Sequence, residues 1–197
     1  YGMVIRDWSS DVCSSDLAAD GFCRVPVSFR RSLGQIADML SSFATGRSTL
    51  VMPDLSDAFA RKLYGTWVSY LPEDCFAYPL DMKRDDRGWL AEFIKSGSFG
   101  QIFISRTKPG ITRGNHWHHS KVEKFLVVSG QALVRFRKIG SEEILEYPVS
   151  GEELKVVDIP TGYTHSITNT GSQDVLTLFW ADELFDPAAP DTFFLGV

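Results

Sequence analysis

The sequence predicts a mainly β fold, with an antiparallel sandwich or barrel over residues 76–197 that follows a short helical region over residues 18–75. Before residue 70, apolar residues recur at spacings of three and four, which is typical of helices. After residue 76, short apolar or alternating segments are separated by Gly, Pro and Asp turn signals about every ten residues, which is typical of antiparallel strands.

The first seventeen residues fit neither region. Residues 7–17 read Asp-Trp-Ser-Ser-Asp-Val-Cys-Ser-Ser-Asp-Leu, which has no structural period and lacks the apolar stretch of a signal peptide. The string resembles one translated reading frame of a common sequencing-library adapter. We therefore expect residues 1–17 to be a non-native, adapter-derived segment, and the natural protein to extend further upstream.

Two helices are expected between residues 18 and 75. The first apolar stripe consists of Leu33, Ile36, Leu40 and Phe43. Ser32 is its expected N-cap and Gly46 its expected C-terminal stop. The second stripe follows Pro53 and Asp54 and consists of Leu55, Phe59, Leu63 and Trp67. The boundary to the β region is expected near Leu71–Asp74.

The β region contains five clear strand segments and a turn at Asp85–Gly88. The segments are Gln101–Arg106, Lys124–Ser129, Ala132–Lys138, Lys155–Ile159 and Val175–Trp180.

Composition excludes several classes of function. Twenty basic and twenty-five acidic side chains give a net charge of −5, which argues against a nucleic-acid or anionic-membrane partner. No apolar run approaches the ~20 residues of a membrane span. Three cysteines cannot all pair within one chain, and this favours a reducing, cytoplasmic location.

The histidines predict a metal site. His116 and His118 are two residues apart and point to one face if they lie on a strand, and Glu123 and His165 follow. Three imidazoles and one carboxylate that converge inside a barrel would bind a divalent metal. We expect zinc, with iron(II) and manganese(II) also compatible with these ligands.

The spacing around these residues resembles the cupin family. Gly110-x5-His116-x-His118-x4-Glu123-x6-Gly130 matches the first cupin motif, and Pro160-x-Gly162-x2-His165-x3-Asn169 matches the core of the second. The second motif usually opens with a glycine where this chain has Leu154, although Gly151 lies nearby. The resemblance implies a jelly-roll barrel, the double-stranded β-helix.

A narrower resemblance is to the CapF family of capsular polysaccharide biosynthesis proteins. It is carried by four segments, Lys108–His119, Glu123–Gly130, Asp158–His165 and Phe185–Leu195. Members of this family are bifunctional. Their cupin epimerises C3 of a UDP-activated 4-keto-6-deoxy-N-acetylhexosamine, and their reductase domain reduces the 4-keto group with NADPH. The product feeds UDP-N-acetyl-L-fucosamine synthesis.

The resemblance implies only half of that activity here. Residues 18–75 resemble the end of the family's extended short-chain dehydrogenase/reductase domain, and residues 76–197 its cupin. The chain has no Gly-x-x-Gly-x-x-Gly loop and no Tyr-x3-Lys pair, so NADPH binding and reduction are not expected in it. Both cupin motifs are present, so the epimerase half is expected to remain.

Epimerisation at C3 needs an acid and a base beside the ketone. Arg113-Gly-Asn-His116 resembles metal-free deoxysugar-nucleotide epimerases, in which this histidine is the base and a lysine occupies the position of Glu123. If His116 ligates a metal, His119 and Tyr163 are the substitutes, although strand alternation turns His119 away. Arg113 is expected to bind the substrate diphosphate.

Two other functions fit the same ligands. The chain could be a non-catalytic, sugar-sensing cupin module or an Fe(II) cupin dioxygenase. A homodimer is expected in each case, because cupins often associate through edge strands.

Overall fold

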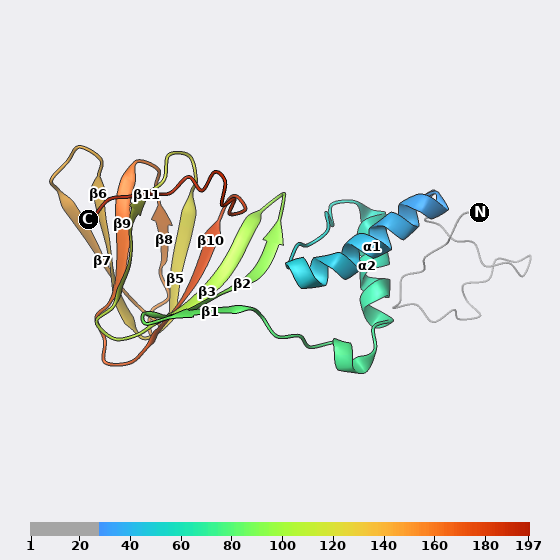
Figure 1. Cartoon of the computed structure of the whole chain (residues 1–197), viewed down its shortest axis with the longest axis horizontal. Coiled ribbons are helices and arrows are strands. Elements are labelled where there is room, and N and C mark those ends of the chain that lie inside the picture. The colour runs from blue at the N-terminus through green and yellow to red at the C-terminus, as the bar shows by residue number, and fades with distance from the viewer. Residues whose placement is uncertain (1–27) are drawn as a thin grey trace, which may run out of the picture. The chain divides into compact units, whose positions relative to one another are not determined.

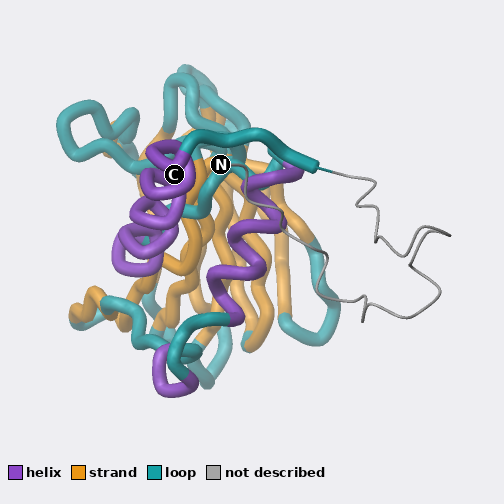
Figure 2. Tube along the Cα trace, turned by 90° about the vertical axis from the view of Figure 1, so that its right-hand side faces the viewer, coloured by secondary structure: helices purple, strands orange, loops and turns teal. Residues whose placement is uncertain are grey.

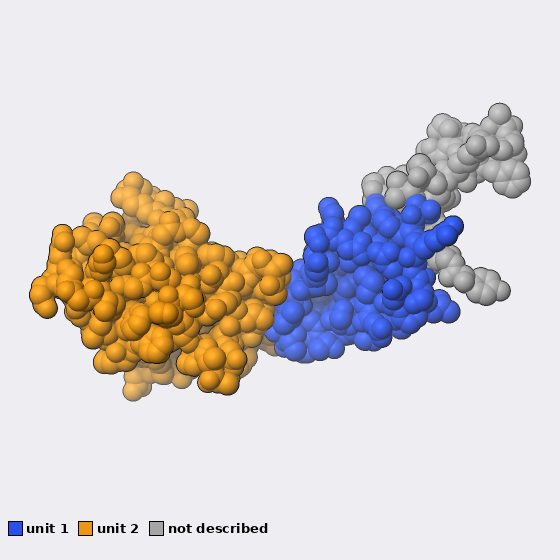
Figure 3. Space-filling model, turned by 90° about the horizontal axis from the view of Figure 1, so that it is seen from above, with its two compact units in different colours: residues 1–78 blue, residues 79–197 orange. Residues whose placement is uncertain are grey.

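The computed structural model describes residues 28–197, which divide into two compact units on either side of the Tyr78–Pro79 bond (Figure 3). The predicted adapter-derived segment, residues 1–17, lies outside the described residues. The helices α1 and α2 belong to the first unit and all the strands to the second (Figures 1 and 2). We call the second unit, residues 79–197, the β unit.

The first unit contains α1 (Leu33–Thr49), α2 (Ala58–Ser69) and a short 3-10 helix, η2 (Glu73–Cys75). The predicted N-cap Ser32 is confirmed. Its hydroxyl accepts a hydrogen bond from the backbone N–H of Gln35 at 3.2 Å, and the Gln35 side chain accepts one from the Ser32 N–H at 2.9 Å. This reciprocal pair is a capping box. The unit's core consists of Ile36, Phe43, Phe59 and Leu63.

Two helix boundaries differ from the prediction. Gly46 does not end α1, which continues to Thr49 and is capped by Leu50 at a φ of 64°. A Cβ atom at position 46 would lie 2.5 Å from the carbonyl oxygen of Val51, so this glycine admits the returning chain. The helix α2 begins after Asp57 and not after Asp54, because the Asp57 carboxylate accepts from the Phe59 N–H at 3.1 Å. Leu55 therefore precedes the helix.

The β unit consists of two antiparallel sheets, of order β1-β2-β3-β10-β5-β8 and β11-β4-β9-β6-β7. This confirms the mainly β prediction, and the five predicted segments fall on β3, β5, β6, β8 and β10. The strands are β1 Met82–Asp85, β2 Gly88–Ser96, β3 Gly100–Thr107, β4 Thr112–Trp117, β5 Glu123–Ser129, β6 Gln131–Lys138, β7 Ile144–Ser150, β8 Val156–Ile159, β9 Tyr163–Asn169, β10 Val175–Ala181 and β11 Phe193–Phe194.

Strand alternation builds the core between the two sheets. On β10, every second residue from Val175 to Ala181 is buried. Phe179 on this face stacks on Phe103 at 4.8 Å between ring centroids and meets Phe125 edge-on at 4.5 Å. Phe125 and Val127 on β5 bury the same core, and Glu123 shares their face of the strand. The apolar pattern of β5 therefore carries one carboxylate into the interior.

Gly130 of the first cupin motif and Gly151, near the start of the second, lie at close backbone approaches, whereas Gly110 and Gly162 have open space around them. Gly130 links β5 to β6 at a φ of 85°, where a Cβ atom would lie 2.8 Å from the Asp174 carbonyl oxygen. Gly151 lies against the end of β5, where a Cβ atom would lie 2.6 Å from the Cα of Ser129. Leu154, at the motif's usual glycine position, is 62% exposed. Gly151 thus supplies the close approach that Leu154 cannot.

Candidate metal centre

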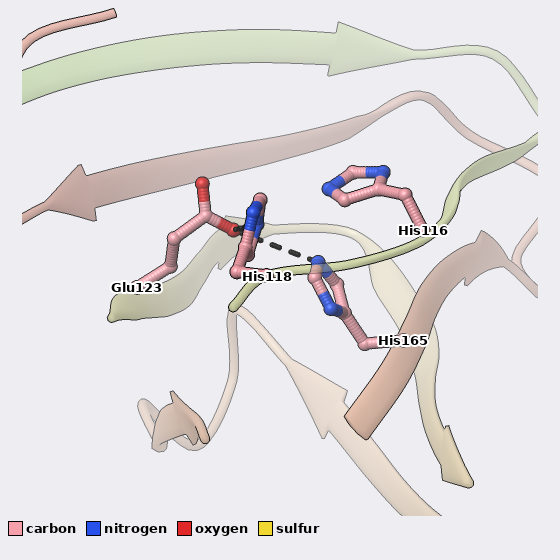
Figure 4. Close-up of side chains that lie close together, drawn as sticks. All are labelled: His116, His118, Glu123 and His165. Atoms are coloured by element: carbon pink, nitrogen blue, oxygen red, sulfur yellow. Dashed lines mark ion pairs between the residues drawn. The ribbon is translucent and has the colours of Figure 1, made fainter. Parts of the chain in front are cut away.

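Four side chains meet at one end of the β unit: His116 on β4, His118 in the following loop, Glu123 at the start of β5 and His165 on β9 (Figure 4). One potential ligand atom from each lies within 4.8 Å of the others. The ring of His116 is 4.5 Å from that of His165 and 4.9 Å from that of His118, centroid to centroid. The structure thus brings together all four residues predicted as ligands.

A β-bulge in β4 aims His116 at this cluster. The register between β4 and β9 shifts between Gly114 and His116, so that His116 pairs with His165 across the sheet. The extra residue, Asn115, has a φ of 57°. A Cβ atom at Gly114 would lie 2.7 Å from the His165 carbonyl oxygen, so glycine is needed for the strands to meet here. Bulges commonly redirect side chains beside functional sites.

One carboxylate oxygen of Glu123 lies close to two imidazoles. Its Oε2 is 3.2 Å from Nε2 of His118 and 3.5 Å from Nε2 of His165 (Figure 4). Burial would raise the pKa of this carboxyl group, but the contacts and charges of the two histidines outweigh burial and lower the pKa to about 2. Glu123 is therefore an anion at neutral pH.

The pKa values of His116 and His118 are shifted in opposite directions. Burial lowers the pKa of His116 to about 4, and the neighbouring His165 and His118 add to the effect. Burial also acts to lower the pKa of His118, but Glu123 outweighs it and the net shift is upward. His116 is thus a neutral imidazole at neutral pH, as a metal ligand or a proton acceptor must be.

The cluster has the donor chemistry of a metal site. Nε2 of His118 and both ring nitrogens of His165 are buried and make no well-aligned hydrogen bond among the described residues, although both Nε2 atoms lie near Oε2 of Glu123. Buried polar atoms are rarely left unsatisfied, because each costs ~1–3 kcal/mol. A divalent cation would satisfy these nitrogens and neutralise Glu123. The four residues therefore could hold a metal ion, and this set of nitrogen and oxygen ligands suits zinc, iron or manganese.

Asp191, which the motifs do not include, reaches the site from the end of the chain. Its carbonyl oxygen lies 2.6 Å from Nδ1 of His118. Its carboxylate accepts hydrogen bonds from the backbone N–H groups of His119, Ser120 and Lys121 at 2.8–2.9 Å. Desolvation opposes ionisation, but these donors hold the pKa of Asp191 well below its usual range. The only sequence signal for Asp191 was its place in the segment Phe185–Leu195 that resembles CapF.

The other predicted site residues lie in different surroundings. His119 is exposed and its ring is 6.3 Å from that of Trp117, so it is not part of the cluster. Tyr163 is half-buried, packs against the core and lies on the same face of β9 as His165. Arg113 Nε donates to Thr107 Oγ1 at 3.0 Å, and its Nη2 lies 3.8 Å from Asp85.

Known proteins resemble this chain in sequence and in structure. Residues 83–193 match the family model described as the polysaccharide biosynthesis C-terminal domain. Over 174 residues the chain is 39% identical to a Pseudomonas aeruginosa protein named UDP-2-acetamido-2,6-beta-L-arabino-hexul-4-ose reductase, covering 88% of this chain and 47% of that protein.

Solved structures show the same relationship. The chain is 51% identical to the capsular polysaccharide assembling protein CapF from Staphylococcus aureus, with a TM-score of 0.87 over 91% of this chain and 49% of that one. A structure of CapF with the inhibitor 3-isopropenyl-tropolone gives a TM-score of 0.86 at 51% identity, over 92% of this chain and 52% of that one. The cupin-like fold is therefore that of CapF. The chain spans about half the length of each of these relatives.

No helix in residues 28–197 is long and apolar enough to cross a membrane.

Proposed function

Because this chain belongs to the family of polysaccharide biosynthesis C-terminal domains, we propose that its β unit is a metal-dependent epimerase acting on a UDP-sugar for surface polysaccharide. The proposed reaction is inversion at C3 of a UDP-activated 4-keto-6-deoxy-N-acetylhexosamine, on the route to UDP-N-acetyl-L-fucosamine. The observation that carries the proposal is the buried cluster of three imidazoles and Glu123. The name of the Pseudomonas relative, a UDP-linked keto-sugar reductase, supports the substrate class.

The proposed metal ligands are His116, His118, Glu123 and His165. A bound divalent cation would supply Lewis-acid stabilisation of negative charge on the substrate's keto oxygen. The chain must also remove the C3 proton and return one to the opposite face. His116 is neutral at neutral pH, but it could accept this proton only if it did not ligate the cation, because its free lone pair cannot do both. Tyr163 is the candidate for returning it, because it shares the face of β9 that carries His165.

The remaining predicted roles are weaker. His119 would have to turn away from Trp117 to reach a bound sugar. Arg113 donates from Nε to Thr107 and places Nη2 3.8 Å from Asp85, so a diphosphate would have to bind its other N–H groups or displace these contacts. We therefore place proton transfer on Tyr163, and on His116 only if it does not ligate the cation, and Arg113 stays the candidate for contacting the substrate's diphosphate.

We propose that the reductase activity of the relatives resides mainly in the half that this chain does not span. The first unit, residues 28–78 as described, would then be the end of a short-chain dehydrogenase/reductase domain. A homodimer in the cytoplasm remains our expectation for the β unit, and light scattering on the purified chain would measure its mass.

Solvent exchange at C3 tests the proposal. The chain is stripped with a chelator, reloaded with zinc, iron(II) or manganese(II), and incubated in D2O with a UDP-4-keto-6-deoxy-N-acetylhexosamine. We expect deuterium at C3 with at least one metal, and no oxidation of added NADPH. Exchange that survives metal removal would leave the metal a structural role. Sugar binding without exchange would favour a sensing module, and oxygen uptake with iron would favour a dioxygenase.

A further inference from the structure

The last residues of the chain form a strap over the proposed metal centre. We call residues 190–195 the C-terminal strap. Figure 1 shows the C-terminal segment, in dark red, running across the top of the β unit. Its strand β11 pairs with the end of β4, so that Phe194 lies opposite His116 and Phe193 opposite Trp117. The strap therefore lies directly beside one of the four proposed ligands.

Two further contacts tie the strap to the other ligand-bearing segments. The hydroxyl of Thr164, the neighbour of His165, donates to the carbonyl oxygen of Leu195. Nζ of Lys121, which lies between His118 and Glu123, donates to the carbonyl oxygen of Pro190 at 3.0 Å. Lys121 is only 6% exposed, so this contact is an interior one. The strap thus touches the chain beside three of the four ligands.

Asp191 makes the most direct contact, through its backbone. A carbonyl oxygen can only accept, so the Nδ1 atom of His118, 2.6 Å away, must carry the proton. Nε2 of His118 is then left with its lone pair, and this is the nitrogen that faces Glu123. A histidine that ligates a metal usually donates its other ring N–H to such an acceptor, which sets its tautomer and orientation.

The Asp191 side chain holds the loop on which His118 lies. Besides the three backbone N–H groups, its carboxylate accepts from the Ser120 hydroxyl at 3.1 Å. The residue has a φ of 37°, in the left-handed region that most side chains disfavour. This conformation presents the carbonyl oxygen to His118 and the carboxylate to residues 119–121 together.

We propose that the C-terminal strap is part of the metal centre, with Asp191 as a positioning residue that sets the ring of His118 and the 118–121 loop for ligation. The inference rests on the metal site of the proposed function. It adds that metal binding and docking of the strap are coupled, so each strengthens the other.

Metal affinity tests the positioning role. The full chain is stripped of metal, and zinc binding is measured by competition with a chromophoric chelator for wild type, Asp191→Ala and Asp191→Asn. We expect Asp191→Ala to weaken binding by about 10- to 100-fold. Asp191→Asn should lie between the two, because asparagine tolerates a positive φ and keeps one acceptor oxygen. The matched control is Asp186→Asn, an exposed carboxylate whose side chain caps only the Ala188 N–H.

Cobalt spectra separate positioning from simple stabilisation. Co²⁺ absorption reports the number and geometry of its ligands. We expect Asp191→Ala to change the visible spectrum, whereas a variant that is merely less stable would keep the wild-type spectrum while folded. An affinity within twofold of wild type, with an unchanged spectrum, would overturn the inference and leave the proposed function standing. Failure of the wild-type chain to bind zinc or cobalt would instead overturn the metal site itself.

Hydrogen exchange on the wild-type chain needs no variant and covers the case in which Asp191→Ala does not fold. Zinc should slow exchange of the His119, Ser120 and Lys121 amides and of the strap. Exchange at these amides that is identical with and without bound zinc would overturn the coupling.

Discussion

Glu123 is a buried carboxylate whose negative charge is only partly balanced by its surroundings. Moving an anion out of water is costly unless it is paired, and here two histidines lie 3.2 and 3.5 Å away. Only an imidazolium repays the full cost, and protonating His118 or His165 would remove its ability to bind a metal. A divalent cation would therefore stabilise the cluster, because it would balance the buried negative charge of Glu123.

Replacing Glu123 tests whether this carboxylate binds a metal. We expect Glu123→Gln to weaken zinc binding by about 100-fold or more, because the only anionic ligand is lost while the side-chain shape is kept. Chelator competition measures the change. The control is Glu142→Gln, an exposed residue outside the cluster, which should bind zinc as wild type does. Equal affinity of Glu123→Gln and wild type would remove Glu123 from the ligand set.

His116 should make the metal-free chain sensitive to acid. Its pKa is lowered from 6.5 to about 4 on folding, so between these values the unfolded chain binds a proton that the folded chain does not. The contribution of His116 to stability must therefore fall as the pH falls below 6.5, with a slope that approaches ~1.4 kcal/mol per pH unit for one proton, whereas the raised pKa of His118 acts in the opposite direction at higher pH.

Urea titrations of the chelator-treated chain between pH 7 and 4.5 measure this slope. His116→Gln should flatten it, because the titrating group is removed. His119→Gln, the same change on the exposed neighbouring histidine, should leave it unchanged. A wild-type free energy of unfolding that stays constant over this range would contradict the assignment.

At the scale of single elements, helix ends that are set by residues close in sequence could be predicted, and ends that are set by tertiary contacts could not. Ser32 and Gln35 lie in one turn, so the start of α1 could be predicted from its capping residues. The end of α1 could not, because Gly46 is explained by the backbone of Val51, which packs against it after the chain reverses. Asp54 and Asp57 are both acceptable caps in sequence, and the Asp57 pair with Arg31, at 2.9 Å, is a tertiary contact.

The first turn of α1 can be tested at its cap. Ser32→Ala removes the acceptor for the Gln35 N–H, and we expect it to lower the stability of the helical unit by ~0.5–2 kcal/mol. Urea unfolding followed by circular dichroism at 222 nm measures the loss. Ser42→Ala makes the same change on an exposed position inside α1 and should cost nothing, since alanine favours helix interiors. Equal effects of the two changes would mean that the cap does not stabilise α1.

In the candidate site, too, features set by residues close in sequence could be predicted, and features set by distant contacts could not. Three ligands lie within eight residues, and the fourth lies in a motif of its own, so their spacing predicted the cluster. Asn115 was not predicted as a bulge, because its role depends on pairing with β9. Asp191 was not predicted as a site residue, because it meets the 118–121 loop from about 70 residues further along the chain. Contacts of that range leave no periodic pattern in a sequence.

At the scale of the whole molecule, residues 72–79 join the two units and all are exposed. Among the described residues of this segment we expect chymotrypsin to cut first after Phe76, which is 57% exposed, whereas Pro79 protects the bond after Tyr78. Mass spectrometry should then find a fragment from residue 77 to Val197 that retains zinc. The exposed Phe93 on β2 is an internal comparison, because Glu92 and Ile94 on either side of it pair with β3 and should protect this segment. Equally early cutting after Phe93 would contradict an independently folded β unit.

The place of the strap in the chain also sets the order in which the site can be assembled. All four proposed ligands have been synthesised by residue 165, but Asp191 and Phe194 are synthesised only later. A nascent chain could therefore pair most of the two sheets while His118 still lacked its acceptor. If the strap positions this ring, the centre cannot mature before residues 190–195 have been synthesised and docked, so the chain would acquire its metal later than most of its fold.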